Sequence, residues 1–196
     1  YYLLDKGEKP GLWVEIQTNQ GQWRLEDRYP PEGMTTLALD LGGALMNVAG
    51  TTTILPNGAT GPVYETEPLE QDVWIAGLPR LHIDVTTATV GGQIYALLED
   101  CNENGSCIHI GHAIMDLRYH EGGTDEQTWL PIIETINAKL EFFTLDAQVS
   151  AGHTIKLSLA STGEDYLPAS TSSVVTIQEG AGSNLLLDLI DPSEKI

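Results

Sequence analysis

The sequence predicts an all-β domain, built as a β-sandwich or jelly roll with little helix. Apolar side chains recur at every second position in many short runs, so each run has one apolar and one polar face, as a sheet with one wet side requires. Turn residues separate these runs, and no window shows a long apolar stripe of helical period. The chain has 196 residues, 41% of them hydrophobic, which is enough for one large domain with a core.

The expected strands follow this alternation along the chain. In the clearest of them, Leu81, Ile83 and Val85 alternate with His82 and Asp84. The other expected strands cover residues 12–16, 35–39, 94–98, 113–119, 136–142, 155–159, 174–177 and 185–189. Turn residues lie between them at 91–92, 102–105, 122–123, 151–152 and 180–182.

Residues 50–68 differ from the rest, because Thr, Pro and Gly are frequent there and the apolar pieces are short. We expect a long loop within one domain, since residues 1–49 carry too few strands to close a core alone. The chain 1–196 then forms a single C-terminal β-sandwich domain, with N-terminal strands and the long loop in 1–67 and the main sandwich in 68–196. The alternative is a domain boundary within this segment.

The charge of the chain restricts its partners. Nine Lys and Arg against 28 Asp and Glu give a formal net charge of −19, which argues against nucleic acid or an anionic membrane as a partner. No signal peptide and no apolar run of membrane-spanning length are visible. The first residue is Tyr1 rather than Met, which suggests a piece of a longer chain. The compartment stays open, with a slight preference for the cytoplasm.

The two cysteines, Cys101 and Cys107, leave two readings open. They form a disulfide in an oxidising compartment or stay two thiols in a cytoplasm, and without clustered histidines they do not make a zinc site. The residues between them resemble the first half of a calcium loop, but Gly111 stands where the chelating Glu is needed. Turn chemistry explains the Asn and Gly residues there. We therefore expect no metal and no cofactor.

Catalytic machinery is not visible in the sequence. The G-x-S-x-G nucleophile elbow of α/β-hydrolases is absent, and no spacing favours a triad of His153, Ser161 and Asp165. His109 and His112 are three residues apart, which places them on opposite faces of a regular strand, so only a bulge would let them share a metal. We expect no catalytic residue in this chain.

Several segments in order resemble one protein family. They are Gly21-Gln22-Trp23-Arg24, Tyr29-Pro30-Pro31, residues 39–45, Pro68-Leu69-Glu70, Ile75-Ala76-Gly77-Leu78-Pro79-Arg80-Leu81, residues 91–100 with Tyr95-Ala96-Leu97-Leu98, Ile110-Gly111-His112, Asp116-Leu117-Arg118-Tyr119, Ala151-Gly152-His153-Thr154-Ile155-Lys156-Leu157 and the loop of residues 161–168. Together they resemble the C-terminal domain of X-Pro dipeptidyl-peptidase and cocaine-esterase-like serine hydrolases. The resemblance implies a jelly-roll sandwich of galactose-binding-like topology.

In that family the catalytic triad belongs to an α/β-hydrolase domain that precedes the sandwich in the same polypeptide. The sandwich packs on this domain and helps to wall the substrate cleft. The resemblance therefore implies a non-catalytic domain whose parent is a proline-specific dipeptidyl peptidase, an esterase or an acylase. None of the family's triad positions is matched in this chain, so the resemblance carries over no catalytic residue.

Four residues are candidates for contact with the missing domain or its cleft: Trp13, Tyr64, Glu65 and Tyr166. Trp13 falls on the polar phase of its strand, Tyr64 and Glu65 lie in the expected long loop, and Tyr166 lies in a loop that shares the family resemblance. One alternative is a free-standing carbohydrate-binding module that stacks sugars on its tryptophans. The other is a homo-oligomerisation domain that uses an exposed sheet edge.

Overall fold

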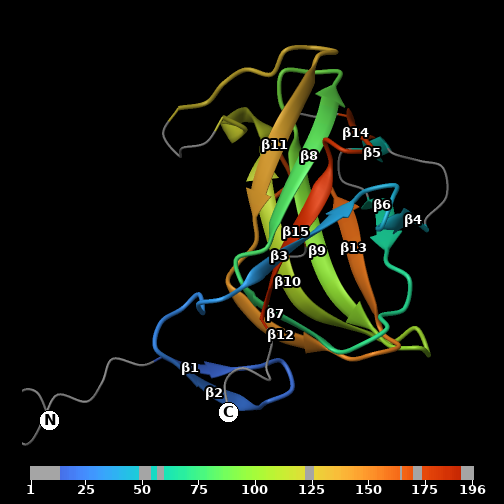
Figure 1. The fold of residues 1–196 in the computed structure, drawn as a ribbon. Coiled ribbons are helices and arrows are strands. Elements are labelled where there is room, and N and C mark those ends of the chain that lie inside the picture. The colour runs from blue at the N-terminus through green and yellow to red at the C-terminus, as the bar shows by residue number, and fades with distance from the viewer. Residues whose placement is uncertain are drawn as a thin grey trace, which may run out of the picture.

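The computed structural model describes residues 14–48, 54–56, 60–121, 126–163, 165–169 and 174–190, which form two antiparallel sheets and a separate hairpin (Figure 1). The predicted all-β sandwich is confirmed, while the jelly-roll arrangement of its strands stays a prediction. Within these ranges the helical structure is the 3₁₀ turn η2 (Leu117–Tyr119), and no helix there is long and apolar enough to cross a membrane.

Fifteen strands are described. They are β1 (Val14–Gln17), β2 (Trp23–Glu26), β3 (Thr35–Asp40), β4 (Met46–Asn47), β5 (Ile54–Pro56), β6 (Thr60–Glu65), β7 (Val73–Gly77), β8 (Arg80–Thr87), β9 (Gln93–Cys101), β10 (Cys107–Asp116), β11 (Thr135–Glu141), β12 (Leu145–Val149), β13 (Thr154–Ala160), β14 (Val174–Gln178) and β15 (Asn184–Ile190).

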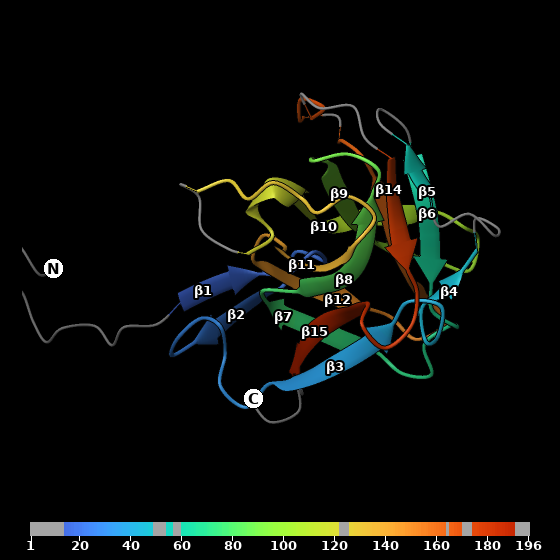
Figure 2. The ribbon, with the colours of Figure 1, turned by 90° about the horizontal axis from the view of Figure 1, so that it is seen from above.

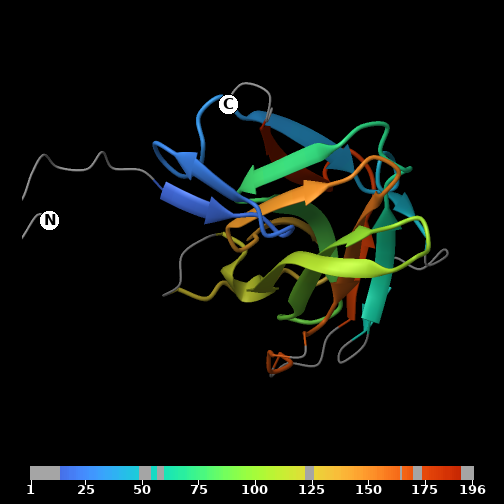
Figure 3. The ribbon, with the colours of Figure 1, turned by 90° about the horizontal axis from the view of Figure 1, so that it is seen from below.

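The strands divide into one large and one smaller sheet. The larger sheet runs β12-β7-β15-β8-β14-β5, with β11 added beside β8 and β3 beside β15. The smaller runs β10-β9-β13-β6-β4, and β1 pairs only with β2 among the described strands. Figures 2 and 3 show the β1–β2 hairpin projecting from the side of the sandwich.

The core lies between the inner faces of the two sheets. Leu81, Ile83 and Val85 of β8 are fully buried, as the alternation predicts. From the facing sheet, Ile155 and Leu157 of β13 are also fully buried. Each such side chain stabilises the fold by about 1.5–3 kcal/mol through removal of apolar surface from water. The polar residues between them face outward, which explains the period of two in the sequence.

Two local expectations differ from the structure. The strand expected to continue to residue 119 ends at Asp116, because the Asp116 carboxylate accepts the backbone N–H of Arg118 at 3.0 Å and caps η2. The segment expected to be a long loop contains β5 and β6. Strand β6 accommodates Pro62, which has no N–H to donate, beside a shift in its register with β13 between Ser158 and Ala160.

Candidate docking surfaces

The β1–β2 hairpin carries an apolar surface on its outward face. The register pairs Gln17 with Trp23 and Glu15 with Leu25, so these four side chains share one face. Trp23 is 67% exposed and Leu25 is 64% exposed. Two large apolar side chains exposed next to each other are typical of a surface that another chain or domain covers.

The opposite face of the hairpin is fastened by a buried ionic cluster. The guanidinium of Arg24 donates to both carboxylate oxygens of Asp146, at 3.1 and 2.5 Å, and to Glu26 at 2.7 Å. The exposed fractions of these side chains are 12% for Arg24, 3% for Asp146 and 5% for Glu26. Trp74 donates its indole N–H to Asp146 at 2.8 Å, and the guanidinium lies 4.9 Å from the Trp74 ring centroid. We call these four residues the Arg24 clamp.

The turn of the hairpin is tied to β12 as well. Asn19 donates its side-chain amide to the carbonyl of Gln148 at 3.1 Å, and the N–H of Gln148 donates back to the Asn19 side chain at 2.9 Å. The backbone N–H of Asn19 also donates to the carbonyl of Asp146 at 3.2 Å. With the turn and the centre both held, the hairpin presents Trp23 and Leu25 in a fixed position.

A β-bulge brings two histidines together on the outer face of the five-stranded sheet. The register of β10 with β9 shifts between His109 and Gly111, so one extra residue is inserted into β10. His109 and His112 therefore share a face, and Nδ1 of His112 lies 3.2 Å from Nε2 of His109. This overturns the expectation that they point to opposite faces. Gly111 was the available signal, because a Gly inside a strand often marks a bulge.

Aromatic rings surround His112. The hydroxyl of Tyr166 lies 2.9 Å from Nε2 of His112. The ring centroids of Phe143, Tyr166 and Tyr95 lie 5.0, 5.8 and 5.9 Å from that of His112. Burial and the neighbouring His109 lower the pKa of His112. We call His109, His112, Tyr95, Phe143 and Tyr166 the histidine–aromatic cluster.

The loop that carries Tyr166 is fixed to the sheet at both ends. Gln93, which is 9% exposed, donates its side-chain amide to the carbonyl of Ser161 at 3.0 Å and to that of Leu167 at 3.2 Å. The hydroxyl of Thr162 donates to the carbonyl of Tyr166 at 2.8 Å. Tyr166 is thereby held over His112 by bonds within its own loop and to β9.

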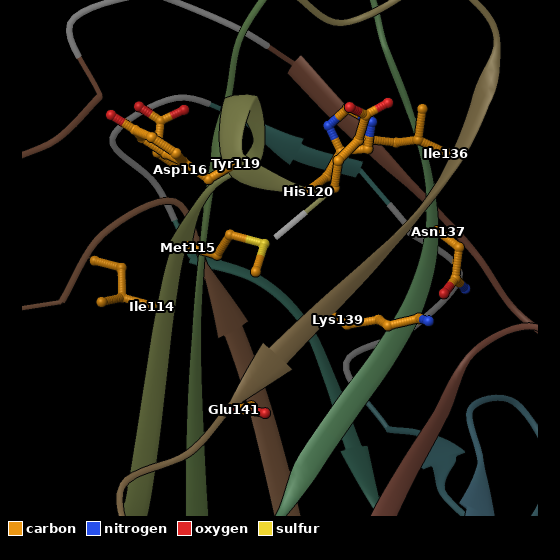
Figure 4. Close-up of a pocket in the computed structure, with 10 residues that line it drawn as sticks. Ile114, Met115, Asp116, Tyr119, His120, Ile136, Asn137, Lys139 and Glu141 are labelled. Atoms are coloured by element: carbon orange, nitrogen blue, oxygen red, sulfur yellow. The ribbon is translucent and has the colours of Figure 1, made fainter. Parts of the chain in front are cut away.

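A groove of about 1150 Å³ lies between β10 and β11, at the seam of the two sheets. Figure 4 shows Met115 pointing into this space, with Asn137 and Lys139 on the β11 side. At its rim Asp116 binds Arg118, whose hydrogen bonds and charge outweigh the effect of burial and lower the pKa of Asp116. The lining of the groove combines apolar and polar side chains, as contact surfaces do. It is lined by Ile114, Met115, Asp116, Tyr119, His120, Glu121, Ile136, Asn137, Lys139 and Glu141.

A family model, the X-Pro dipeptidyl-peptidase C-terminal non-catalytic domain, matches residues 6–180. The chain belongs to this family. No curated protein matches the sequence.

Solved structures share the fold of this X-Pro dipeptidyl-peptidase C-terminal domain. A CocE/NonD family hydrolase from Staphylococcus aureus matches with a TM-score of 0.76 at 10% identity, over 97% of this chain and 44% of that chain. An aminopeptidase from a marine sediment archaeon, Thaumarchaeota archaeon, gives 0.67 at 13% identity, over 89% and 40%. An α-amino acid ester hydrolase gives 0.64 at 14% identity, over 90% and 41%. The chain thus spans less than half the length of these proteins.

The structure of the X-Pro dipeptidyl-peptidase C-terminal domain separates the four residues suggested by the sequence. Glu65 and Tyr166 lie on the outer side of the five-stranded sheet, where Glu65 accepts the hydroxyl of Thr154. Tyr64 is fully buried in the core, and this burial raises the pKa of its phenol. The prediction that Tyr64 faces another domain is therefore wrong, because β6 is a strand and neighbouring side chains point to opposite faces. Trp13 lies outside the described residues.

The other sequence candidates in this domain have structural partners. Cys101 and Cys107 pair across β9 and β10 and are joined by a disulfide in the structure. Asn102 accepts the backbone N–H groups of Asn104 and Ser106, each at 3.0 Å, which closes the turn between the cysteines. Trp74 is held in the Arg24 clamp. Its indole N–H and its ring therefore have partners within the domain, which argues against Trp74 as a sugar-stacking residue.

Proposed function

We propose that this domain packs on an α/β-hydrolase domain of the same polypeptide and helps to shape the substrate cleft of that domain. The single C-terminal domain 1–196 then comprises the N-terminal strands and the long segment of 1–67 and the main sandwich of 68–196. The family description is non-catalytic, and the matched hydrolase, aminopeptidase and ester hydrolase chains are each more than twice as long. Both findings support a separate catalytic domain.

The outward face of the hairpin carries this proposal. Trp23 and Leu25 are exposed although the hairpin beneath them is firmly held, so the described part of the chain presents an apolar face that it does not cover. A large aromatic at the centre of an interface commonly contributes about 2 kcal/mol or more when truncated to a small residue. The neighbouring Glu15 and Gln17 supply the polar rim that docking surfaces have.

The same relatives support a proposal for the substrate class of the parent. The matched proteins are named as an aminopeptidase, an ester hydrolase and a broader hydrolase family. We therefore assign the parent to serine hydrolases that cleave amide or ester bonds of aminoacyl substrates. Glu65, Tyr166 and Trp13 remain the candidates for the side of the domain that faces the cleft.

The test uses the full-length polypeptide with the double substitution Trp23→Ser and Leu25→Ser. We expect faster proteolysis between the domains and a higher KM for an aminoacyl ester or an X-Pro anilide. The matched control is Trp129→Ser, since Trp129 is 64% exposed and lies in the segment before β11, outside the hairpin. Equal proteolysis and kinetics in the double variant and the control would reject the hairpin as the docking face.

A homo-oligomer is the second candidate that the same surface favours, because an exposed apolar face also fits a second copy. Light scattering on the chain distinguishes docking within one polypeptide from self-association. A monomer supports docking within one polypeptide, whereas a dimer that the double substitution dissociates supports self-association.

A further inference from the structure

We propose that His109 and His112 form a binding site for a divalent transition-metal ion such as Zn²⁺, Cu²⁺ or Ni²⁺, held between Nε2 of His109 and Nδ1 of His112. The inference concerns the outer face of the five-stranded sheet and does not depend on how the hairpin docks. It rests on the bulge in β10, the distance between the two nitrogens and the groups that orient His112.

The distance fits a shared metal ion. Zinc binds histidine nitrogen at about 2.0–2.1 Å, so two imidazoles on a tetrahedral ion have ligand atoms about 3.3 Å apart. The two nitrogens lie 3.2 Å apart here. Both histidines belong to β10, which is paired with β9 on either side of the bulge, so the backbone places the two side chains on one face of the sheet.

Tyr166 orients His112 for this role. Its hydroxyl lies 2.9 Å from Nε2 of His112, so a proton on Nε2 is donated to the phenol oxygen and leaves the lone pair of Nδ1 free for a metal. Phe143 packs edge-on against the same ring at a centroid distance of 5.0 Å. Such a hydrogen bond from the second ring nitrogen is the usual support of a metal-binding histidine.

The protons balance without a co-reactant. Without metal, in the tautomer that carries the His112 proton on Nδ1, this N–H donates to Nε2 of His109. Metal binding moves the His112 proton from Nδ1 to Nε2, where Tyr166 turns its hydroxyl to accept it. Two neutral rings then bind the ion with no net release of protons.

The donor set determines which ions bind. Imidazole nitrogen suits Zn²⁺, Cu²⁺ and Ni²⁺, whereas Mg²⁺ and Ca²⁺ require oxygen ligands. The described residues contain no group of three or more His, Cys, Asp or Glu able to hold one ion, so this part of the chain supplies two ligands and water can complete the coordination. The formal net charge of −19 raises the local concentration of any cation.

Thermal unfolding of the chain with ZnCl₂ alone, in a buffer without reductant, tests the proposal. A ligand that binds only the folded state raises Tm in proportion to the logarithm of its concentration above Kd. We expect Zn²⁺ to raise Tm, MgCl₂ to leave it unchanged, and His109→Gln or His112→Gln to abolish the zinc effect. The matched control is His82→Gln, which changes a histidine of the other sheet. This variant should still show the rise in Tm with zinc.

Tyr166→Phe distinguishes a metal site from a merely structural histidine pair. Loss of such an orienting bond typically weakens metal binding about 10- to 100-fold, so the zinc concentration needed for a given rise in Tm should increase by that factor. Since His109 is exposed, His109→Gln keeps the test valid if a substitution of His112 prevents folding. An unchanged Tm with zinc in the wild type, or a zinc effect that survives in His109→Gln, overturns the proposal.

Discussion

Removal of Arg24 should release the β1–β2 hairpin from the sandwich. Arg24→Ala leaves the carboxylate of Asp146, which is 3% exposed, buried without the guanidinium that pairs with it, and it removes the same guanidinium from Glu26, which is 5% exposed. Removal of one partner of a buried ion pair typically costs about 3–5 kcal/mol. Asp146→Asn should cost less, about 1–2 kcal/mol, because Arg24 keeps Glu26 and the new amide oxygen can still accept from Trp74.

Hydrogen exchange of peptides that cover residues 14–26 measures this loss locally. At 1.4 kcal/mol for each factor of ten, Arg24→Ala should accelerate exchange by about two to three and a half powers of ten, up to the rate of the fully open hairpin. Peptides from β13 should exchange as in the wild type. Exchange in Arg24→Ala within tenfold of the wild type, or a larger effect from Asp146→Asn, would refute the assignment of the clamp.

Three further substitutions test other parts of the fold. Tyr29→Phe should cost about 1–3 kcal/mol in urea unfolding, because the Tyr29 hydroxyl accepts the N–H of Gly77 at 2.8 Å and donates to the carbonyl of Leu145. Ile133→Gly should raise stability by about 1 kcal/mol and so raise Tm, since Ile133 is 81% exposed and has φ of 67°, a conformation that strains a β-branched residue. Burial lowers the pKa of His82, so the folded state resists its protonation and stability falls as the pH drops below about 6.5. His82→Gln should lose less stability than the wild type between pH 7 and 5. An equal loss of stability in the two proteins would contradict this prediction.

The fold class was accessible from the sequence because burial repeats with the period of the strand. Leu81, Ile83 and Val85 are an example, since each alternate residue is fully buried and the pattern is local. Strand β12 was missed although it follows the same rule, as the burial of Ala147 and Val149 shows. Strand β7 was also missed, because its consecutive residues 75–77 are all buried and show no alternation. Short strands offer few residues from which to see a period.

The candidate surfaces were harder to predict from the sequence than the fold class, because their geometry depends on residues distant in the sequence. The bulge that joins His109 to His112 arises from pairing with β9, and only Gly111 hints at it. The burial of Tyr64 rather than Glu65 depends on the register of β6 with β13, since a shift by one residue exchanges the two faces. The expectation for Tyr166 named a residue that the structure places over His112, but its role stays a proposal.

The Arg24 clamp also imposes an order on assembly during synthesis. Arg24 and Asp146 are separated by 122 positions in the sequence. At about 5–20 residues per second, the ribosome needs about 6–24 s to make that intervening stretch. Until then the hairpin has no carboxylate on β12 to receive it, and its isolated two strands are at best marginally stable. Trp23 and Leu25 therefore take up their fixed places only after β12 has emerged, so a neighbouring domain meets the finished surface only after that point.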